Sequence, residues 1–150
     1  MRVYKYILLF LVASLLNSCA LKPITSKYTF VETNLDKITL DKLGNGKILI
    51  YNGADILHKI DNTARLNVWI NDKALGQIRP REYVIINLKK GNYTFKALHI
   101  DVLKMKSTHD VRIDKDTRII KIKPNITSNR LTVINELLKK FEKYKYAVKR

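Results

Sequence analysis

Cysteine, proline and glycine are scarce in this chain, with one, three and five residues among 150. A single cysteine excludes an internal disulfide and leaves no second thiolate for a zinc site. Acidic residues are also few, because 13 Asp and Glu stand against 29 Lys and Arg, which gives a formal net charge of +16. No apolar run reaches the roughly 20 residues that a membrane-spanning helix needs. These absences exclude a disulfide-stapled scaffold and direct attention to the lone cysteine.

The residues before that cysteine have the three parts of an export signal. Arg2 and Lys5 provide a positive start, an apolar run of ten residues extends from Ile7 to Leu16, and Asn17 and Ser18 are small and polar. A buried core helix is the alternative, but the run carries neither a cap nor an amphipathic pattern. The sequence therefore predicts a signal peptide over residues 1–18.

The order Leu16-Asn17-Ser18-Cys19 resembles the lipobox of bacterial lipoproteins. The resemblance implies that a diacylglyceryl group is attached to the Cys19 sulfur and that a peptidase, recognising Leu16, Asn17 and Ser18, cuts before the cysteine. The alternative is a free thiol in an ordinary secreted chain, which is unusual in an oxidising compartment. Ala20 does not resemble the inner-membrane retention signal. We therefore expect a lipid-anchored cell-envelope protein, on the periplasmic face of the outer membrane if the cell has two membranes.

The excess of basic residues would survive removal of the leader. Residues 1–18 contain Arg2 and Lys5 and no acidic residue, so the remaining 132 residues would carry a formal charge of +14. Such a charge favours phosphate-rich surfaces, which outside the cytoplasm are anionic lipids or wall polymers. Nucleic acid is not expected as the partner of an exported chain. The alternative is that the lysines are simply solvated.

The apolar pattern predicts a mainly β, small antiparallel sandwich of six or seven strands over residues 46–134. The chain before it, residues 19–45, reads as a lipidated N-terminus and flexible tether spanning near 28 Å for about 25 residues. Strands are expected at 47–51, 66–70 and 130–134, with Asn71 and Asp72 forming a tight turn after the second. Hairpins are expected within 82–101, where Gly91 would take a left-handed conformation, and within 110–123, where Pro124 would end the strand.

The period changes after residue 134. Apolar side chains recur at helical spacing within 135–150, at Leu137, Leu138, Phe141, Tyr144 and Val148. Asn135 is a suitable N-cap, and lysines gather late in the segment, as the helix dipole favours. The sequence predicts an amphipathic C-terminal α-helix packed on the domain, with insertion into a membrane as the alternative.

The stretch from Leu66 to Ala97 resembles the lipoprotein family called domain of unknown function 2846, and more distantly the PEGA family. The motif consists of a hairpin at Asn71-Asp72-Lys73, Gly76, Tyr83 and the turn Leu88-Lys89-Lys90-Gly91. Tyr93 stands where a His is common, and the hairpin lacks its Gly. The resemblance covers about residues 46–140. It implies a PEGA/Ig-like sandwich and a lipoprotein, and brings no known catalytic residues.

Candidate catalytic and metal-binding residues lack the spacing that their chemistry requires. The three histidines, His58, His99 and His109, show no i, i+4 pair, and the serines lie outside any nucleophile elbow (Ser26, Ser107, Ser128). We expect His99 and Asp101 to form a surface pair. The segment Gly44–Lys47 reads as a turn, and Asp110, Asp114 and Asp116 do not match a calcium loop. We therefore predict no catalytic residue, metal or cofactor.

Aromatic and basic residues offer two further possibilities. Trp69 with Tyr51, Tyr83 and Tyr93 could form a platform for sugar or peptide, although such side chains more often belong to the core. A single face crowded with lysines would fit a module that binds anionic glycolipid or wall polymer (Lys89, Lys90, Lys96, Lys121, Lys123). The leading hypothesis is a non-enzymatic binding or structural module with an envelope protein as partner. An envelope hydrolase with a spatially assembled site and the basic binding module are the alternatives.

Overall fold

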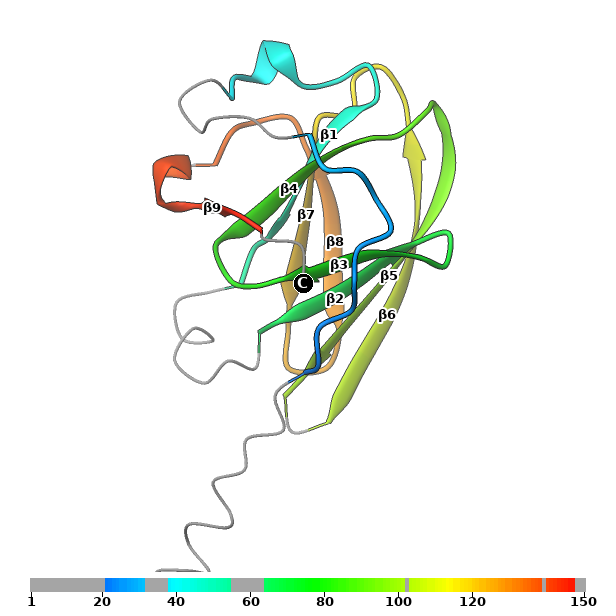
Figure 1. Ribbon diagram of the computed structural model, residues 1–150, viewed down its shortest axis with the longest axis vertical. Helices are drawn as coiled ribbons and strands as arrows, with labels where there is room; N and C mark the ends of the chain where they lie inside the picture. Colours follow the sequence, from blue (N-terminus) through cyan, green and yellow to red (C-terminus); the bar gives the residue numbers. More distant parts are fainter. Residues whose placement is uncertain (1–20, 32–37, 55–63, 102, 139, 148–150) are drawn as a thin grey trace, which may run out of the picture.

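Two packed β-sheets form the fold in the computed structural model, which describes residues 21–31, 38–54, 64–101, 103–138 and 140–147 (Figure 1). The mainly β sandwich that the apolar pattern predicts is thus confirmed. The described residues hold nine strands: β1 (Lys47–Asn52), β2 (Leu66–Ile70), β3 (Lys73–Ile78), β4 (Glu82–Asn87), β5 (Gly91–Ile100), β6 (Lys104–Ile113), β7 (Ile119–Pro124), β8 (Asn129–Ile134) and β9 (Lys145–Tyr146). Two single-turn 3₁₀ helices accompany them, η2 (Leu40–Lys42) and η4 (Phe141–Lys143).

The first sheet has five strands in the order β8-β7-β1-β4-β9. β1 pairs antiparallel with β4 but parallel with β7, and β9 is parallel to β4. The expected antiparallel sandwich of six or seven strands is therefore corrected to a mixed one with two parallel pairs. Neither parallel pair is formed by consecutive strands: β7 is reached from β6 of the second sheet, and β9 follows β8 within the first sheet, so no hairpin forces these neighbours to be antiparallel.

The second sheet has four antiparallel strands in the order β3-β2-β5-β6. Asn71 (φ 48°) and Asp72 (φ 62°) form the predicted tight turn between β2 and β3. A bulge between Val68 and Trp69 shifts the register of this pair, and Gly76, at φ +117°, lies opposite Val68. A backbone in the left-handed region favours glycine, which explains that residue here.

The two expected hairpins do not exist, because their strands lie in different sheets. β4 belongs to the first sheet and β5 to the second, while β6 and β7 are separated in the same way. β5 pairs with β6 over ten residues, and β7 pairs with β8 as far as Pro124. Gly91 is the first residue of β5 and lacks the positive φ that a hairpin turn would have required. The alternating pattern of a strand specifies which side chains face the central core, whichever neighbour the strand has.

The β5–β6 and β7–β8 connections lie at one end of the sandwich, which we call the lower end (Figure 1). The crossings between the sheets at residues 88–90 and 114–118 lie at the opposite, upper end. One strand, β5, runs from the upper end at Gly91 to the lower end at Ile100, about 30 Å at 3.3 Å per residue.

A core of aliphatic side chains fills the space between the sheets. The first sheet contributes the residues that alternate inward along β1, β4 and β7, and the second contributes those of β2, β5 and β6 (Ile48, Ile50, Val84, Ile86, Ile120, Ile122, Leu66, Val68, Ile70, Phe95, Ala97, Val111, Ile113). Nearly all of them are completely buried. Continuous burial of this kind is the main stabilising term of a sandwich.

A second apolar cluster covers the outer face of the first sheet. Leu49, Tyr51, Tyr83, Ile85 and Ile119 face away from the central core and are buried by chain from both ends of the domain. The C-terminal residues of this cover are Leu137, Leu138, Phe141, Tyr144 and Tyr146. The expected packing of the C-terminal segment on the domain is therefore observed in its described part.

The expected C-terminal α-helix is wrong for the described residues 135–138 and 140–147. Lys140 adopts a left-handed conformation (φ 64°), η4 forms a single turn, and β9 then pairs with the edge of β4. The Tyr144 ring meets Tyr51 edge-on at 5.5 Å, and Tyr146 meets Tyr83 in the same way at 5.3 Å. Tertiary contacts and edge hydrogen bonds thus override the helical spacing, because local propensity is worth only a few tenths of a kcal/mol per residue. Val148 lies outside the described residues.

The segment expected to be a flexible tether is packed on the sandwich wherever it is described. Residues 21–31, here called the N-terminal segment, run the length of the molecule from the lower end (Figure 1). Lys27 N donates to Ala74 O at 2.9 Å, and Val31 N donates to Ile85 O at 2.8 Å. The segment therefore bonds first to β3, an edge strand of the second sheet, and then to β4 of the first sheet. Ile38 and Leu43, further along, are buried in the outer cluster.

Candidate functional site

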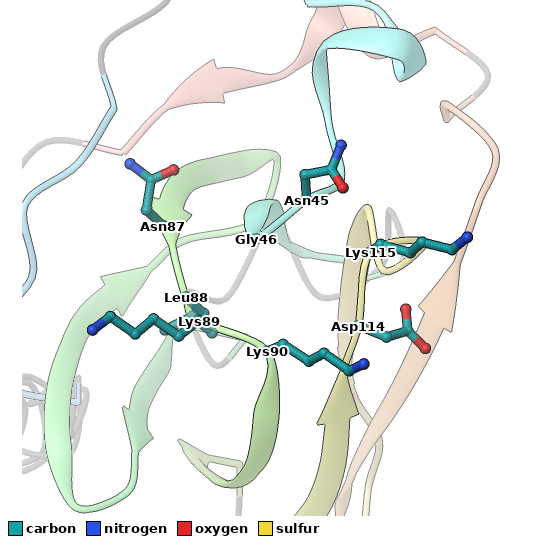
Figure 2. Close-up of a pocket in the computed structure, with 8 residues that line it drawn as sticks. All are labelled: Asn45, Gly46, Asn87, Leu88, Lys89, Lys90, Asp114 and Lys115. Atoms are coloured by element: carbon teal, nitrogen blue, oxygen red, sulfur yellow. The ribbon is translucent and has the colours of Figure 1, made fainter.

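A cavity lies at the upper end, where the chain crosses between the sheets (Figure 2). Its volume is about 550 Å³, and three connections line it: the residues before β1, the β4–β5 crossing and the β6–β7 crossing. The lining residues are Asn45, Gly46, Asn87, Leu88, Lys89, Lys90, Asp114 and Lys115. We call this hollow the upper cavity.

Backbone hydrogen bonds hold the three connections together. Leu88 N donates to Gly46 O at 2.8 Å, and Asn45 N donates to Lys115 O at 2.9 Å. Gly46 has φ +89°, and a Cβ on it would lie 2.4 Å from Leu88 O. Only glycine permits this approach. The wall of the upper cavity is therefore preorganised by the backbone.

Among the lining residues, Asp114 forms hydrogen bonds within its own turn. Its Oδ1 accepts hydrogen bonds from Asp116 N, Thr117 N and the Thr117 hydroxyl, each at 2.9 Å. The Thr117 hydroxyl first, and then the backbone N–H groups and Arg112, hold the pKa of this carboxyl below its usual value. Asp114 is therefore ionised at neutral pH and committed to structure, which does not suit a general acid.

Basic groups dominate the upper cavity, with three lysines against one carboxylate. Figure 2 shows the side chains of Lys89 and Lys115 extending in opposite directions, with the ammonium group of Lys90 between them, so the three cations do not converge on one point. One compact phosphate would be better served by converging donors. The spread favours an extended anion with several charges.

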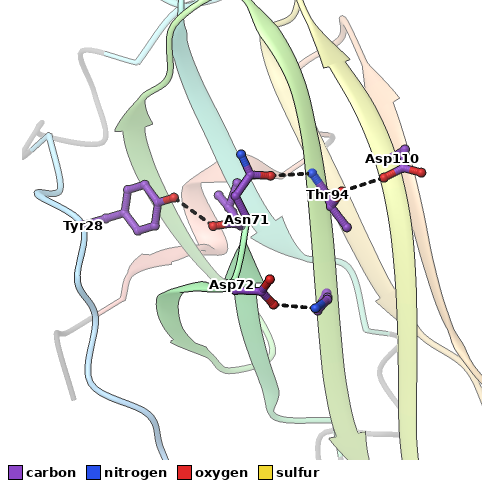
Figure 3. A network of polar contacts seen from close by, with 7 residues as sticks. Tyr28, Asn71, Asp72, Thr94 and Asp110 are labelled. Atoms are coloured by element: carbon purple, nitrogen blue, oxygen red, sulfur yellow. Dashed lines mark hydrogen bonds and ion pairs between the residues drawn. The ribbon is translucent and has the colours of Figure 1, made fainter.

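A smaller cavity, about 230 Å³, lies on the outer face of the second sheet and is lined by Trp69, Asp72, Lys96, Leu98 and Lys106. Asp72 forms an ion pair with Lys96, whose hydrogen bond and charge lower the pKa of the Asp72 carboxyl. Figure 3 shows the neighbouring contacts, in which Thr94 N donates to Asn71 Oδ1 and the Thr94 hydroxyl donates to Asp110, both at 2.8 Å. Tyr28 of the N-terminal segment donates to Ile70 O at 3.2 Å. These bonds fix the β2–β3 turn against β5.

The aromatic platform is not formed. Trp69 lies half-buried on the outer face of the second sheet, whereas Tyr51 and Tyr83 are buried beyond the other sheet. Tyr93 packs against the central core and donates to Lys89 O at 2.9 Å. The four aromatic side chains therefore lie in three separate places, and three of them pack in apolar clusters, as the alternative of a structural role in the core implied.

Two histidines meet one asparagine near the lower end. His99 is buried and its Nδ1 lies 2.8 Å from Asn129 Oδ1, while His109 Nε2 lies 2.7 Å from Asn129 O. The expected surface pair of His99 and Asp101 is wrong, because β5 ends at Ile100 and His99 faces inward. His58 lies outside the described residues. Within the described ranges, no group of three His, Cys, Asp or Glu side chains is placed to hold a metal.

The serines occupy unrelated positions. Ser26 lies in the N-terminal segment, Ser128 in the β7–β8 connection, and Ser107 in β6 opposite Ala97. The buried Ser107 hydroxyl has no hydrogen-bond partner among the described residues. An activated serine needs a base within hydrogen-bond reach, so Ser107 does not meet that requirement in this structure.

The expected single basic face is wrong. Lys89 and Lys90 line the upper cavity, and Lys96 projects from the outer face of the second sheet. Lys121 pairs with Tyr51, whose side chain lies on the outer side of the first sheet. Lys123, two residues further along β7, lies on the same side. Only two of the five lysines share a site. Lys115 joins them there, which the sequence did not indicate because it lies 25 residues away.

Comparisons of the chain with protein-family models, with curated proteins and with solved structures give no match. In the part of the chain that the structure describes, no helix has the length and apolar character needed to cross a membrane. Leu16, Asn17, Ser18 and Cys19 lie outside the described residues.

Proposed function

We propose that this protein is a lipid-anchored envelope protein, held by acyl chains on Cys19, whose sandwich binds an extended anionic polymer or glycolipid in the upper cavity. The lipobox resemblance of Leu16 to Cys19 supports the anchor. The basic upper cavity is the observation that supports the ligand class. The binding is non-enzymatic, since the lining offers cations and amides but no nucleophile paired with a base.

The position of the upper cavity fits an anchored module. Leu21 lies two residues after Cys19, and its carbonyl accepts a hydrogen bond from Gln77. Asn67 bonds to the next carbonyl, of Lys22, and pairs with Leu98 on β5, so the start of the N-terminal segment lies near Leu98. Gly91 adjoins the upper cavity and precedes Leu98 by seven residues on β5, which is a distance of about 23 Å along the strand. The ligand would therefore be met well away from the point of attachment.

The anchor is tested with Cys19→Ser. We expect the wild-type protein to fractionate with membranes and to carry the mass of its acyl chains, and the variant to lose both. An unacylated thiol at Cys19 in the wild-type product would contradict the anchor.

The ligand is tested with purified lipopolysaccharide and with wall teichoic acid as probes. We expect the charge-neutralising variant Lys89→Gln/Lys90→Gln/Lys115→Gln to bind at least about tenfold more weakly, with binding by the wild type falling as salt rises. The matched control changes three exposed lysines outside the cavity (Lys27→Gln, Lys143→Gln, Lys145→Gln). Equal losses in the two triple variants would show that net charge alone drives binding, against a site in the upper cavity.

A further inference from the structure

The first described residue, Leu21, lies two positions after the proposed lipid attachment point. Leu21 is buried, with 7% of its surface exposed, and its carbonyl accepts a hydrogen bond from Gln77 Nε2 at 3.0 Å. The next carbonyl, of Lys22, accepts one from Asn67 Nδ2 at 2.8 Å. The N-terminal segment is thus part of the sandwich from its first described residue.

Covalent geometry then limits how far the domain can stand from a bilayer. Leu21 is two residues from Cys19, and two residues span at most about 7 Å. The polar interfacial layer of a bilayer is itself about 5–7 Å thick on each side. An acylated Cys19 would therefore hold the lower end of the sandwich against the lipid headgroups.

The lower end carries the apolar side chains that such a position requires. Leu103, in the β5–β6 connection, is 66% exposed, and Ile126, in the β7–β8 connection, is 71% exposed. Asn129 Nδ2 donates to Met105 O at 3.0 Å, which joins the two hairpins behind these side chains. Figure 1 shows both connections at the end from which the N-terminal segment starts. Two exposed aliphatic side chains, which we call the tips, therefore lie at the end where the N-terminal segment starts.

Basic side chains are found on the same segments. Lys22 follows Leu21, Lys104 follows Leu103, and Arg130 is the second residue of β8; all three are exposed. Lys123 pairs with Arg130 on the neighbouring strand. Asp101 is the acidic residue in the described part of the same connections. Aliphatic groups that enter the acyl boundary and cations that meet anionic headgroups are the combination by which peripheral domains bind a membrane surface.

We infer that the anchored sandwich rests on an anionic phospholipid bilayer through Leu103 and Ile126, with the upper cavity facing away from it. This inference rests on the proposed lipid anchor. A domain docked in this way has a fixed height and orientation above the bilayer, unlike a domain on a long flexible tether. The reason is that the two tips and the acyl chains hold the same end of the sandwich to the membrane. The upper cavity is then held at roughly the length of β5 above the headgroups, about 30 Å.

The chain suits a labelling experiment, because an acylated Cys19 leaves no other thiol. The variants Leu103→Cys, Ile126→Cys and Lys90→Cys each receive an environment-sensitive fluorophore. The purified acylated proteins are added to vesicles of phosphatidylethanolamine and phosphatidylglycerol. We expect labels at 103 and 126 to shift to the blue and to be quenched by lipid-borne nitroxides, and the label at 90, in the upper cavity, to remain as in water.

The outcomes separate this inference from the anchor. Proteins that float with the vesicles while all three labels report water would overturn the docking and leave the anchor intact. Proteins that do not float would overturn the anchor and the docking with it. Labels at 103 and 126 that are shielded in the Cys19→Ser background without vesicles would show that a second copy covers the tips, against docking on lipid.

Discussion

Gln77 and Leu21 are joined by a hydrogen bond of 3.0 Å across 56 positions of sequence. The donor is the side chain of an outward-facing residue of β3, and the acceptor is the first described carbonyl of the N-terminal segment. This bond, with that from Asn67 to Lys22 O, holds the first described residues of the N-terminal segment against the second sheet. The two bonds therefore limit the distance between the domain and Cys19, which is two residues before Leu21.

Removing both donors should release the start of the N-terminal segment. In the double variant Asn67→Ala/Gln77→Ala we expect faster amide hydrogen exchange in residues 21–31, about tenfold for each 1.4 kcal/mol lost from local stability. Exchange of peptides from β5 and β6 serves as the internal control. Unchanged exchange in residues 21–31 would show that strand-edge bonds such as Lys27 N to Ala74 O hold the segment without these side chains.

The two tyrosines that meet edge-on in the outer cluster should respond oppositely to loss of the hydroxyl. The Tyr83 hydroxyl is buried without a hydrogen-bond partner among the described residues, whereas the Tyr146 hydroxyl donates to Val31 O at 2.9 Å. We expect Tyr83→Phe to leave the free energy of unfolding unchanged or to raise it by up to about 1 kcal/mol. Tyr146→Phe, the matched control, should lower it by about 1 kcal/mol. Urea denaturation measures both, and a clear loss in Tyr83→Phe would contradict the assignment.

Buried tyrosines also predict an alkaline limit to stability. Burial, together with Tyr144 in the case of Tyr51, raises the pKa of the Tyr51 and Tyr83 phenols. A group whose pKa is raised on folding contributes its full stability below the unfolded value, about 10, and this is lost as pH rises from there towards the folded pKa. We therefore expect absorbance at 295 nm to show these phenols ionising together with unfolding. The double variant Tyr51→Phe/Tyr83→Phe should unfold at a higher pH, and an unchanged midpoint would refute the prediction.

Asn129 should be among the most sensitive polar residues of the lower end. Its amide donates to Ala97 O and Met105 O, and its Oδ1 meets His99 Nδ1, so one side chain of β8 joins both strands of the opposite sheet. We expect Asn129→Ala to lower the free energy of unfolding by about 2–4 kcal/mol, because buried groups lose their partners. Asn92→Ala, an exposed asparagine of β5, is the control and should change it by less than about 0.5 kcal/mol. Thermal unfolding distinguishes them, and similar melting temperatures would contradict a stabilising role for Asn129.

The candidate site could be predicted from sequence only in fragments. The sequence predicts one turn at Leu88–Gly91 and another at Gly44–Lys47, but nothing in it indicates that the two lie side by side. The upper cavity exists because β4–β5 and β6–β7 cross between the sheets at the same end, which brings Asn45 to Lys115. The available signal was the clustering of glycine, asparagine and lysine residues in turns next to strands. No local pattern indicates which of the connections between the sheets lie side by side.

The sequence by itself determined which residues alternate into a core, and hence that the chain forms short strands packed as a sandwich. It also determined the Asn71-Asp72 turn, since positive φ is a local property, and the end of β7 at Pro124. Only the tertiary structure decided which strands pair, because alternation specifies the buried face and not the neighbour. It likewise decided that residues 21–31 and the described residues of 135–147 pack on the sandwich without forming an α-helix, since strand edges and the outer face of the first sheet offered them more contacts than a free tether or a helix could.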